Sequence, residues 1–102
     1  MSDQNRKQRI EETETTEEKV KAFYAEDRVV DLINNLYARW QHESEYEDFA
    51  DYAALMEKLF EGMDDSFTFV KAVQRPFGMK FKVDGRLFRI SASRSRYNLT
   101  EL

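Results

Sequence analysis

The chain of 102 residues contains no cysteine, one proline and only three glycines. Without cysteine it can form neither a disulfide framework nor a zinc site with thiolate ligands. The glycines are isolated from one another, which excludes a glycine-rich loop that cradles phosphates. The sequence also lacks a run of eighteen apolar residues, and its first residues are polar with no apolar segment behind them. We therefore expect a cytoplasmic protein that does not cross a membrane.

Signatures of catalysis are equally scarce. His42 is the only histidine, and no cysteine exists to pair with it. Glu47 and Asp51, or Asp48 and Asp51, can share a helix face and suit Mg²⁺, but nothing else in the sequence converges on them. Asp84 is used by a turn. We expect no enzymatic activity, no metal and no cofactor, so a small hydrolase or nuclease with a carboxylate-bound metal is the least favoured of three hypotheses.

Aromatic residues, by contrast, are abundant: eight phenylalanines, five tyrosines and one tryptophan. Each buried ring removes roughly 150 to 250 Å² from water, which argues against disorder of the whole chain. Residues 1–14 have only Ile10 as a sizeable apolar side chain. The sequence therefore predicts a flexible tail over 1–14 and one domain over 15–102.

Helical periodicity occupies the first part of this domain. Thr15 and Glu18 form a capping box, and apolar residues then recur at three- and four-residue spacing as far as Trp40. Residues 26–28 interrupt this stripe, so either Asp27 caps a second, shorter helix or one long helix bends there. A second capping box at 44–47 precedes another stripe over 49–63, with a helix end expected near Gly62. These patterns predict a helical hairpin of two or three helices.

The last third of the chain predicts strands. Residues 67–73 are rich in aromatic and β-branched side chains, and 75–78 form a turn signal. Residues 79–90 form a hairpin around Asp84-Gly85, whose two-residue turn pairs Lys80 with Arg89. The predicted fold is α+β, with the helical hairpin packed on a three-stranded antiparallel sheet. A winged-helix arrangement, with 79–90 as the wing, is the alternative.

Charge is divided unevenly along the chain. Residues 1–70 contain 8 basic and 18 acidic residues, whereas residues 71–102 contain 8 basic and 2 acidic ones. Such a division offers partners two surfaces of opposite sign. Alternatively, the two halves lie against each other and neutralise one another.

The leading functional hypothesis is a small regulatory or inhibitory module that binds a protein through its acidic helical surface. Its candidate residues are Glu45, Glu47, Asp48 and Asp51, with Tyr52 beside them. A dense carboxylate array complements a basic partner or imitates the phosphates of nucleic acid, and small inhibitors of phages and mobile elements have such a composition. An ordinary solvated helix face explains the same residues.

The second hypothesis is a nucleic-acid-binding protein that uses the outward face of the hairpin. Its candidate residues are Lys80, Lys82 and Arg89, continued by Arg75, Arg94 and Arg96. This cluster lacks the surface aromatics that stack on bases, so contact with the phosphate backbone is expected. The competing explanation is a solvated face whose lysines discourage pairing between sheet edges. Association into a homodimer is compatible with either hypothesis.

Overall fold

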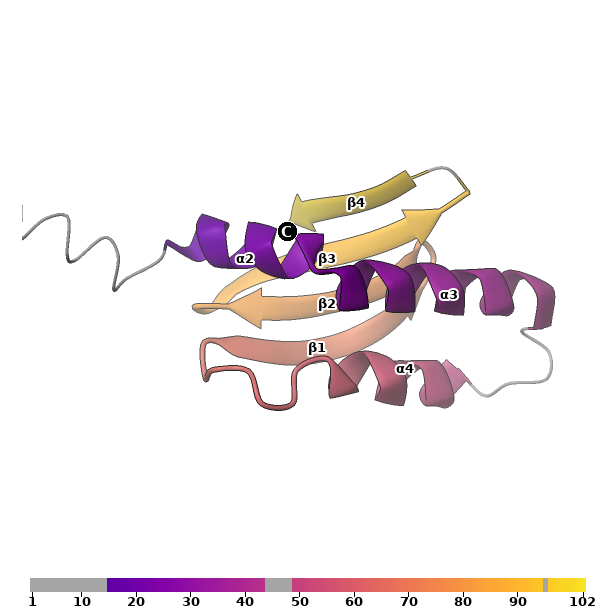
Figure 1. Cartoon of the computed structure of the whole chain (residues 1–102), viewed down its shortest axis with the longest axis horizontal. Helices are drawn as coiled ribbons and strands as arrows, with labels where there is room; N and C mark the ends of the chain where they lie inside the picture. The colour runs from indigo at the N-terminus through magenta and orange to yellow at the C-terminus, as the bar shows by residue number, and fades with distance from the viewer. Residues whose placement is uncertain (1–14, 44–48, 95) are drawn as a thin grey trace, which may run out of the picture.

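A computed structural model describes residues 15–43, 49–94 and 96–102. Within them the chain forms helices followed by strands, which confirms the predicted α+β class. The elements are α2 (Thr16–Ala25), α3 (Asp27–Glu43), α4 (Phe49–Lys58), β1 (Phe67–Gln74), β2 (Phe77–Val83), β3 (Arg86–Ser93) and β4 (Arg96–Glu101) (Figure 1). In the described ranges no helix is long and apolar enough to cross a membrane.

The first helical stripe is divided into two helices. The Thr15 hydroxyl accepts from the Glu18 amide at 3.1 Å and the Glu18 carboxylate accepts from the Thr15 amide at 3.0 Å, which confirms the first capping box. α2 ends at Ala25, and the extended backbone of the next residue, Glu26, breaks the helix. The Glu26 carbonyl then accepts from Val30 at 3.0 Å, so α3 restarts at once. Of the two alternatives at this point, the chain forms a second helix, which is longer than the first and is preceded by Glu26.

The second stripe forms α4, which runs antiparallel to α3 (Figure 1). α4 ends at Lys58, and turns with short-range hydrogen bonds, such as that from the Phe60 amide to the Glu57 carbonyl, follow it. Gly62 has a left-handed φ of +80°, but it lies four residues beyond the end of α4, so the helix end predicted near Gly62 was placed too late. The capping box predicted over 44–47 lies outside the described residues.

The sheet has four antiparallel strands in the order β1-β2-β3-β4, so the prediction of three strands was wrong. The register of the central hairpin is confirmed: Lys80 pairs with Arg89, and Phe81 with Phe88. The missed strand is β4, which pairs with β3 from Arg96 to Glu101. The winged-helix alternative was also wrong, because the 79–90 hairpin is the central pair of the sheet.

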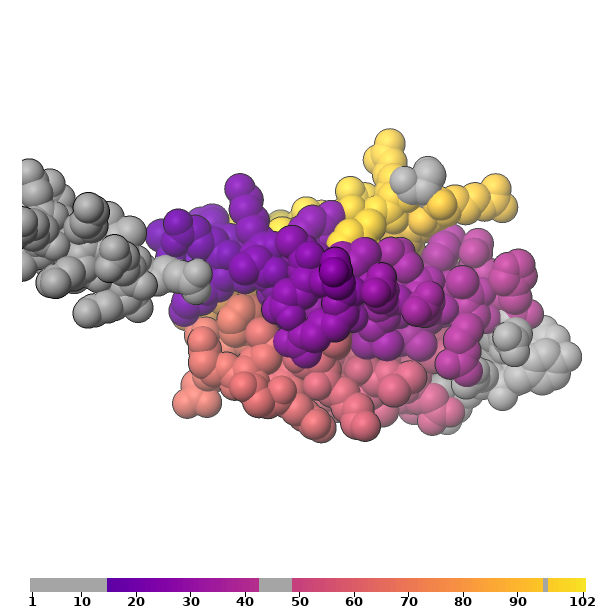
Figure 2. All heavy atoms as spheres, in the orientation of Figure 1, coloured from indigo at the N-terminus to yellow at the C-terminus, as the bar shows by residue number. Residues whose placement is uncertain are grey.

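The described helices α2, α3 and α4 pack against one face of the sheet, and in Figure 2 they cover much of this face. Alternate residues of β2 and β3 point into this interface and are buried, as a half-buried antiparallel sheet requires. Aromatic rings dominate the contact. Phe23 of α2 lies 5.2 Å from Phe81 between ring centroids, and Trp40 of α3 lies 5.3 Å from Phe77. The rings therefore lie between the helices and the sheet, and no helix in the described part of the chain covers the opposite face of the sheet.

Candidate nucleic-acid interface

The sheet face turned away from the helices, called the open face below, is fixed by the strand register. Residues opposite one another in an antiparallel pair point to the same side, so the partners of Lys80 and Lys82 share their face. The open face consists of Thr68, Lys71, Val73, Gly78, Lys80, Lys82, Leu87, Arg89, Ser91, Ser93, Arg96, Asn98 and Thr100. Five of these residues are basic and none is acidic.

Three of the cations form a row across neighbouring strands. Lys71 of β1 pairs with Lys80 of β2, and Lys80 pairs in turn with Arg89 of β3. With strands about 4.8 Å apart, the row spans roughly 10 Å. Like charges directly opposite one another destabilise a sheet. The row therefore lowers the stability of the free protein, and a negatively charged ligand would offset this destabilisation.

Lys71 was missed by the sequence reasoning, and a β-bulge explains why. The alternation of Phe67 and Phe69 places residue 71 on the helix side if the strand is regular. The register of β1 shifts between Phe69 and Lys71, with the extra residue Val70 left 40% exposed. The bulge turns Lys71 to the open face. Val70 is an ordinary β-branched residue in a strand rich in aromatic residues, so the sequence does not indicate the bulge.

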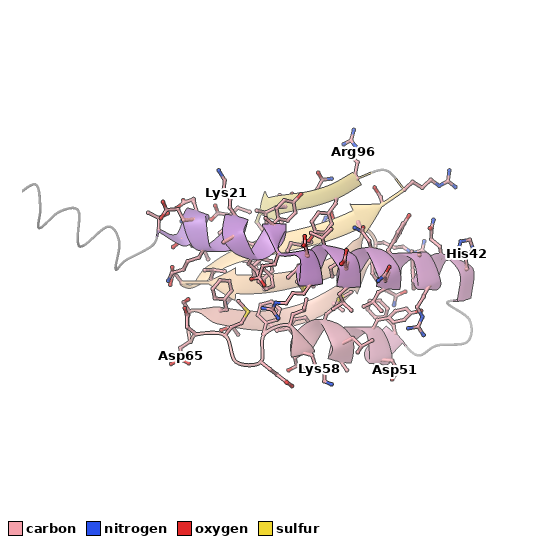
Figure 3. All side chains as sticks on the ribbon, in the orientation of Figure 1. Lys21, His42, Asp51, Lys58, Asp65 and Arg96 are labelled. Atoms are coloured by element: carbon pink, nitrogen blue, oxygen red, sulfur yellow. The ribbon has the colours of Figure 1, made fainter. Side chains whose placement is uncertain are left out.

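Arg75, Arg94 and Arg96 lie at one end of the sheet. Arg75 is in the β1–β2 turn and Arg94 in the β3–β4 connection, and these two turns are at the same end of the antiparallel strands. All three residues are exposed, and the Arg96 side chain projects outward from the start of β4 (Figure 3). These arginines extend the basic surface beyond the row.

The two acidic residues of the last third of the chain, Asp84 and Glu101, form their contacts away from the open face. Asp84 accepts a hydrogen bond from Thr16 at 2.7 Å and pairs with Lys19 at 3.2 Å. Glu101 forms a two-point pair with Arg86, at 2.7 and 2.9 Å. Both contacts lie on the helix side, where they tie the turn and the last strand in place. Among the described residues, no ion pair or hydrogen bond engages the side chains of the basic row, so these cations are not neutralised within the fold.

The same contacts make stability depend on pH. The hydrogen bond from Thr16, followed by the bond and charge of Lys19, lowers the pKa of Asp84, and the bond from Arg86 lowers the pKa of Glu101. A carboxylate with a lowered folded-state pKa contributes stability above its unfolded pKa of about 4 and loses it as pH falls through the folded value. We expect the stability difference between the unaltered protein and Asp84→Asn to be full at pH 6 and to shrink below about pH 4.

Urea unfolding between pH 3 and 7 measures this difference. Asp65→Asn is the matched control, since it removes an exposed carboxylate without an ion pair or hydrogen bond in the described part of the chain. Its effect should be small at every pH. An Asp84→Asn effect that grew as the pH fell would contradict the role assigned to Asp84.

The residues predicted to form an acidic protein-binding surface are only partly described by the structure. Glu45, Glu47 and Asp48 lie outside the described residues, and Asp51 is exposed on α4 (Figure 3). Tyr52 is only 1% exposed, which corrects its placement on the surface. Its ring packs edge-on against Phe77, at 6.0 Å between centroids, with the Arg39 guanidinium over it. Tyr52 therefore belongs to the core that joins α4 to the sheet.

Other chemistry has little support in the described residues. They contain no group of three or more acidic residues or histidines placed to hold a metal ion. His42 is exposed near the end of α3 (Figure 3). Tyr97, which lies on β4, stacks on Tyr24 at 4.7 Å, and burial raises the pKa of its hydroxyl. No protein-family model, no curated protein and no solved structure matches this chain.

Proposed function

We propose that the protein binds the phosphate backbone of duplex nucleic acid through the open face of its sheet, without reading the base sequence. One observation carries this proposal: Lys71, Lys80 and Arg89 stand side by side across three strands, and the described residues place no carboxylate on the same face. Roughly 10 Å of duplex axis carries about six phosphate charges. A ligand of that charge density offsets the repulsion within the row.

A duplex is favoured over a single strand because the aromatic residues are on the other face. Proteins that bind single strands stack the bases on exposed aromatic rings. The open face has none: its apolar members are Val73 and Leu87, while the rings of β2 and β3 point toward the helices. Lysine and arginine side chains on a flat sheet contact phosphates and carry little sequence information.

Salt dependence tests the proposal. If Lys71, Lys80, Lys82 and Arg89 each contact one phosphate, a plot of log affinity against log salt has a slope of about −3.6. Affinity for a 20-base-pair duplex then falls roughly a hundredfold between 50 and 200 mM salt. Fluorescence polarisation with two unrelated duplex sequences should give the same slope for both.

Neutralising the row should reduce that slope. Lys80→Gln with Arg89→Gln removes two contacts and is expected to lower the slope by about 2. Lys21→Gln with Lys58→Gln, which makes the same charge change on α2 and α4, is the matched control (Figure 3). A tighter complex with a single strand than with the duplex, or equal slopes for the two variants, would exclude this function.

A further inference from the structure

A cavity of about 310 Å³ opens beside the end of α4 and the start of β1. Its lining combines three aromatic rings with two carboxylates: Phe60, Phe67 and Phe69, together with Glu57, Glu61 and Thr68. The aromatic side chains belong to the helix side of the sheet, so this cavity is separate from the basic row. It is called the β1 pocket below.

The rings give the β1 pocket a fixed apolar surface. Phe60 lies 5.7 Å from Phe69 between centroids, and both rings are half-buried. Phe23 holds this group to the core, since it lies 5.1 Å from Phe60 and 5.6 Å from Phe67. Aromatic faces attract cations through the ring quadrupole. The floor of the pocket therefore suits a ligand with an apolar stem and a positive head.

The carboxylates supply the complementary charge. Glu57 and Glu61 are exposed and four residues apart, and Glu57 lies in the last turn of α4. Because Glu57 is near the C-terminus of α4, its negative charge is unfavourable with respect to the helix dipole. In the described residues no ion pair or hydrogen bond engages either side chain. These residues therefore leave both carboxylates without a neutralising partner, and a bound cation would offset the unfavourable charge of Glu57 at the end of α4.

We propose that the β1 pocket binds an arginine or lysine side chain of a partner protein. The methylene stem packs on Phe60 and Phe69, and the cationic head lies between Glu57 and Glu61. The volume is at the lower end of the range for ligand sites, roughly 300 to 1,000 Å³, and suits one long side chain. Charge complementarity selects the basic residue. This site is independent of the proposed nucleic-acid surface, which has the opposite sign.

The test is an NMR titration of the full chain with two peptides that differ only in charge. One is acetyl-Gly-Leu-Arg-Leu-Gly-amide, and the other has neutral citrulline in place of arginine. The arginine peptide should shift the backbone amide resonances of Thr68 and Phe69 and bind about tenfold more tightly. Equal binding of the two peptides, or shifts confined to other parts of the chain, would overturn the proposal.

Paired variants separate the pocket from net charge. Glu57→Gln with Glu61→Gln should remove the tenfold preference for arginine. Asp31→Asn with Asp51→Asn, an equal charge change on α3 and α4 outside the pocket lining, should preserve it. If both double variants lost the preference for the arginine peptide equally, net charge alone would explain the effect. The urea midpoint of the pocket variant should match or exceed that of the unaltered protein; a lower midpoint would give the two carboxylates a structural role instead.

Two other occupants of the β1 pocket, a basic segment of the chain itself and a polyamine, give distinct experimental outcomes. The basic segment contains Arg6, Lys7 and Arg9. If changing all three to glutamine in the full chain tightened peptide binding several-fold, this segment would be the occupant and the partner assignment would fail. Spermine that bound as tightly as the arginine peptide would identify a polyamine site and also overturn the assignment. We expect neither the tighter peptide binding nor the tight spermine binding.

Discussion

Replacing Lys80 and Arg89 together by glutamate is expected to weaken duplex binding by at least a hundredfold at 100 mM salt, with the fold retained. The two residues are neighbours in the basic row, on adjacent central strands. Each lost phosphate contact removes about 0.9 from the salt slope, equivalent to roughly eightfold in affinity at this salt concentration. Two lost contacts therefore account for roughly sixtyfold, and the introduced carboxylates add repulsion from the phosphates.

The matched control is Lys21→Glu with Lys58→Glu, which makes the same change in net charge from the helical layer. Its loss of affinity should be less than tenfold, because neither residue is on the open face. Circular dichroism of both variants should match that of the unaltered protein, since the substituted side chains lie on the surface. Equal losses in the two variants would mean that net charge, not the row, governs binding.

Features set by neighbouring residues were predicted well from the sequence. The capping box of Thr15 and Glu18 needs only a side-chain oxygen and a glutamate three residues on. The hairpin register follows from the Asp84-Gly85 turn, in which both residues adopt a positive φ, at 53° and 81°. Because the side-chain period of a strand is two, that turn also places Lys80, Lys82 and Arg89 on one face.

Features that depend on distant partners were missed. The sequence of β4 is short and polar, and what orders it comes from far along the chain: Tyr24 stacks on Tyr97 and donates to its carbonyl at 2.5 Å. Tyr52 is at the edge of its helical stripe, and its contact with Phe77, far along the chain, joins it to the core. Local periodicity contains no information on either contact.

The open face was therefore predicted in part. Its register followed from the turn, but its full width did not, because β4 and the bulge before Lys71 were missed. Whether carboxylates neutralise the cations of the open face depends on tertiary packing, which local sequence does not determine. Asp84 and Glu101 are engaged on the helix side by Lys19 and Arg86, and sequence distance gives no indication of that choice.

The largest expected loss of stability follows from Gly78→Ala. Gly78 lies in β2, between Val73 of β1 and Ser91 of β3. A Cβ at this position would be 1.9 Å from the Ile90 carbonyl oxygen and 2.8 Å from the Ser91 Cα. Both are backbone atoms of a central strand, so β2 and β3 would have to separate. We expect a cost of about 3 kcal/mol or more, a large part of the 5 to 15 kcal/mol that stabilises a typical domain.

Thermal unfolding measures this cost as a fall of at least about 12 °C in Tm, at roughly 4 °C per kcal/mol. Gly62→Ala is the control: its φ of +80° is unfavourable for alanine, but no atom lies within 4 Å of the added Cβ. That variant should lose only about 1 to 2 kcal/mol. Comparable losses at the two glycines would mean that the close approach of β2 and β3 is not the cause. Lys80 and Arg89 pair one step along from Gly78 on the same face, so a separation of β2 and β3 at this glycine would also displace the basic row.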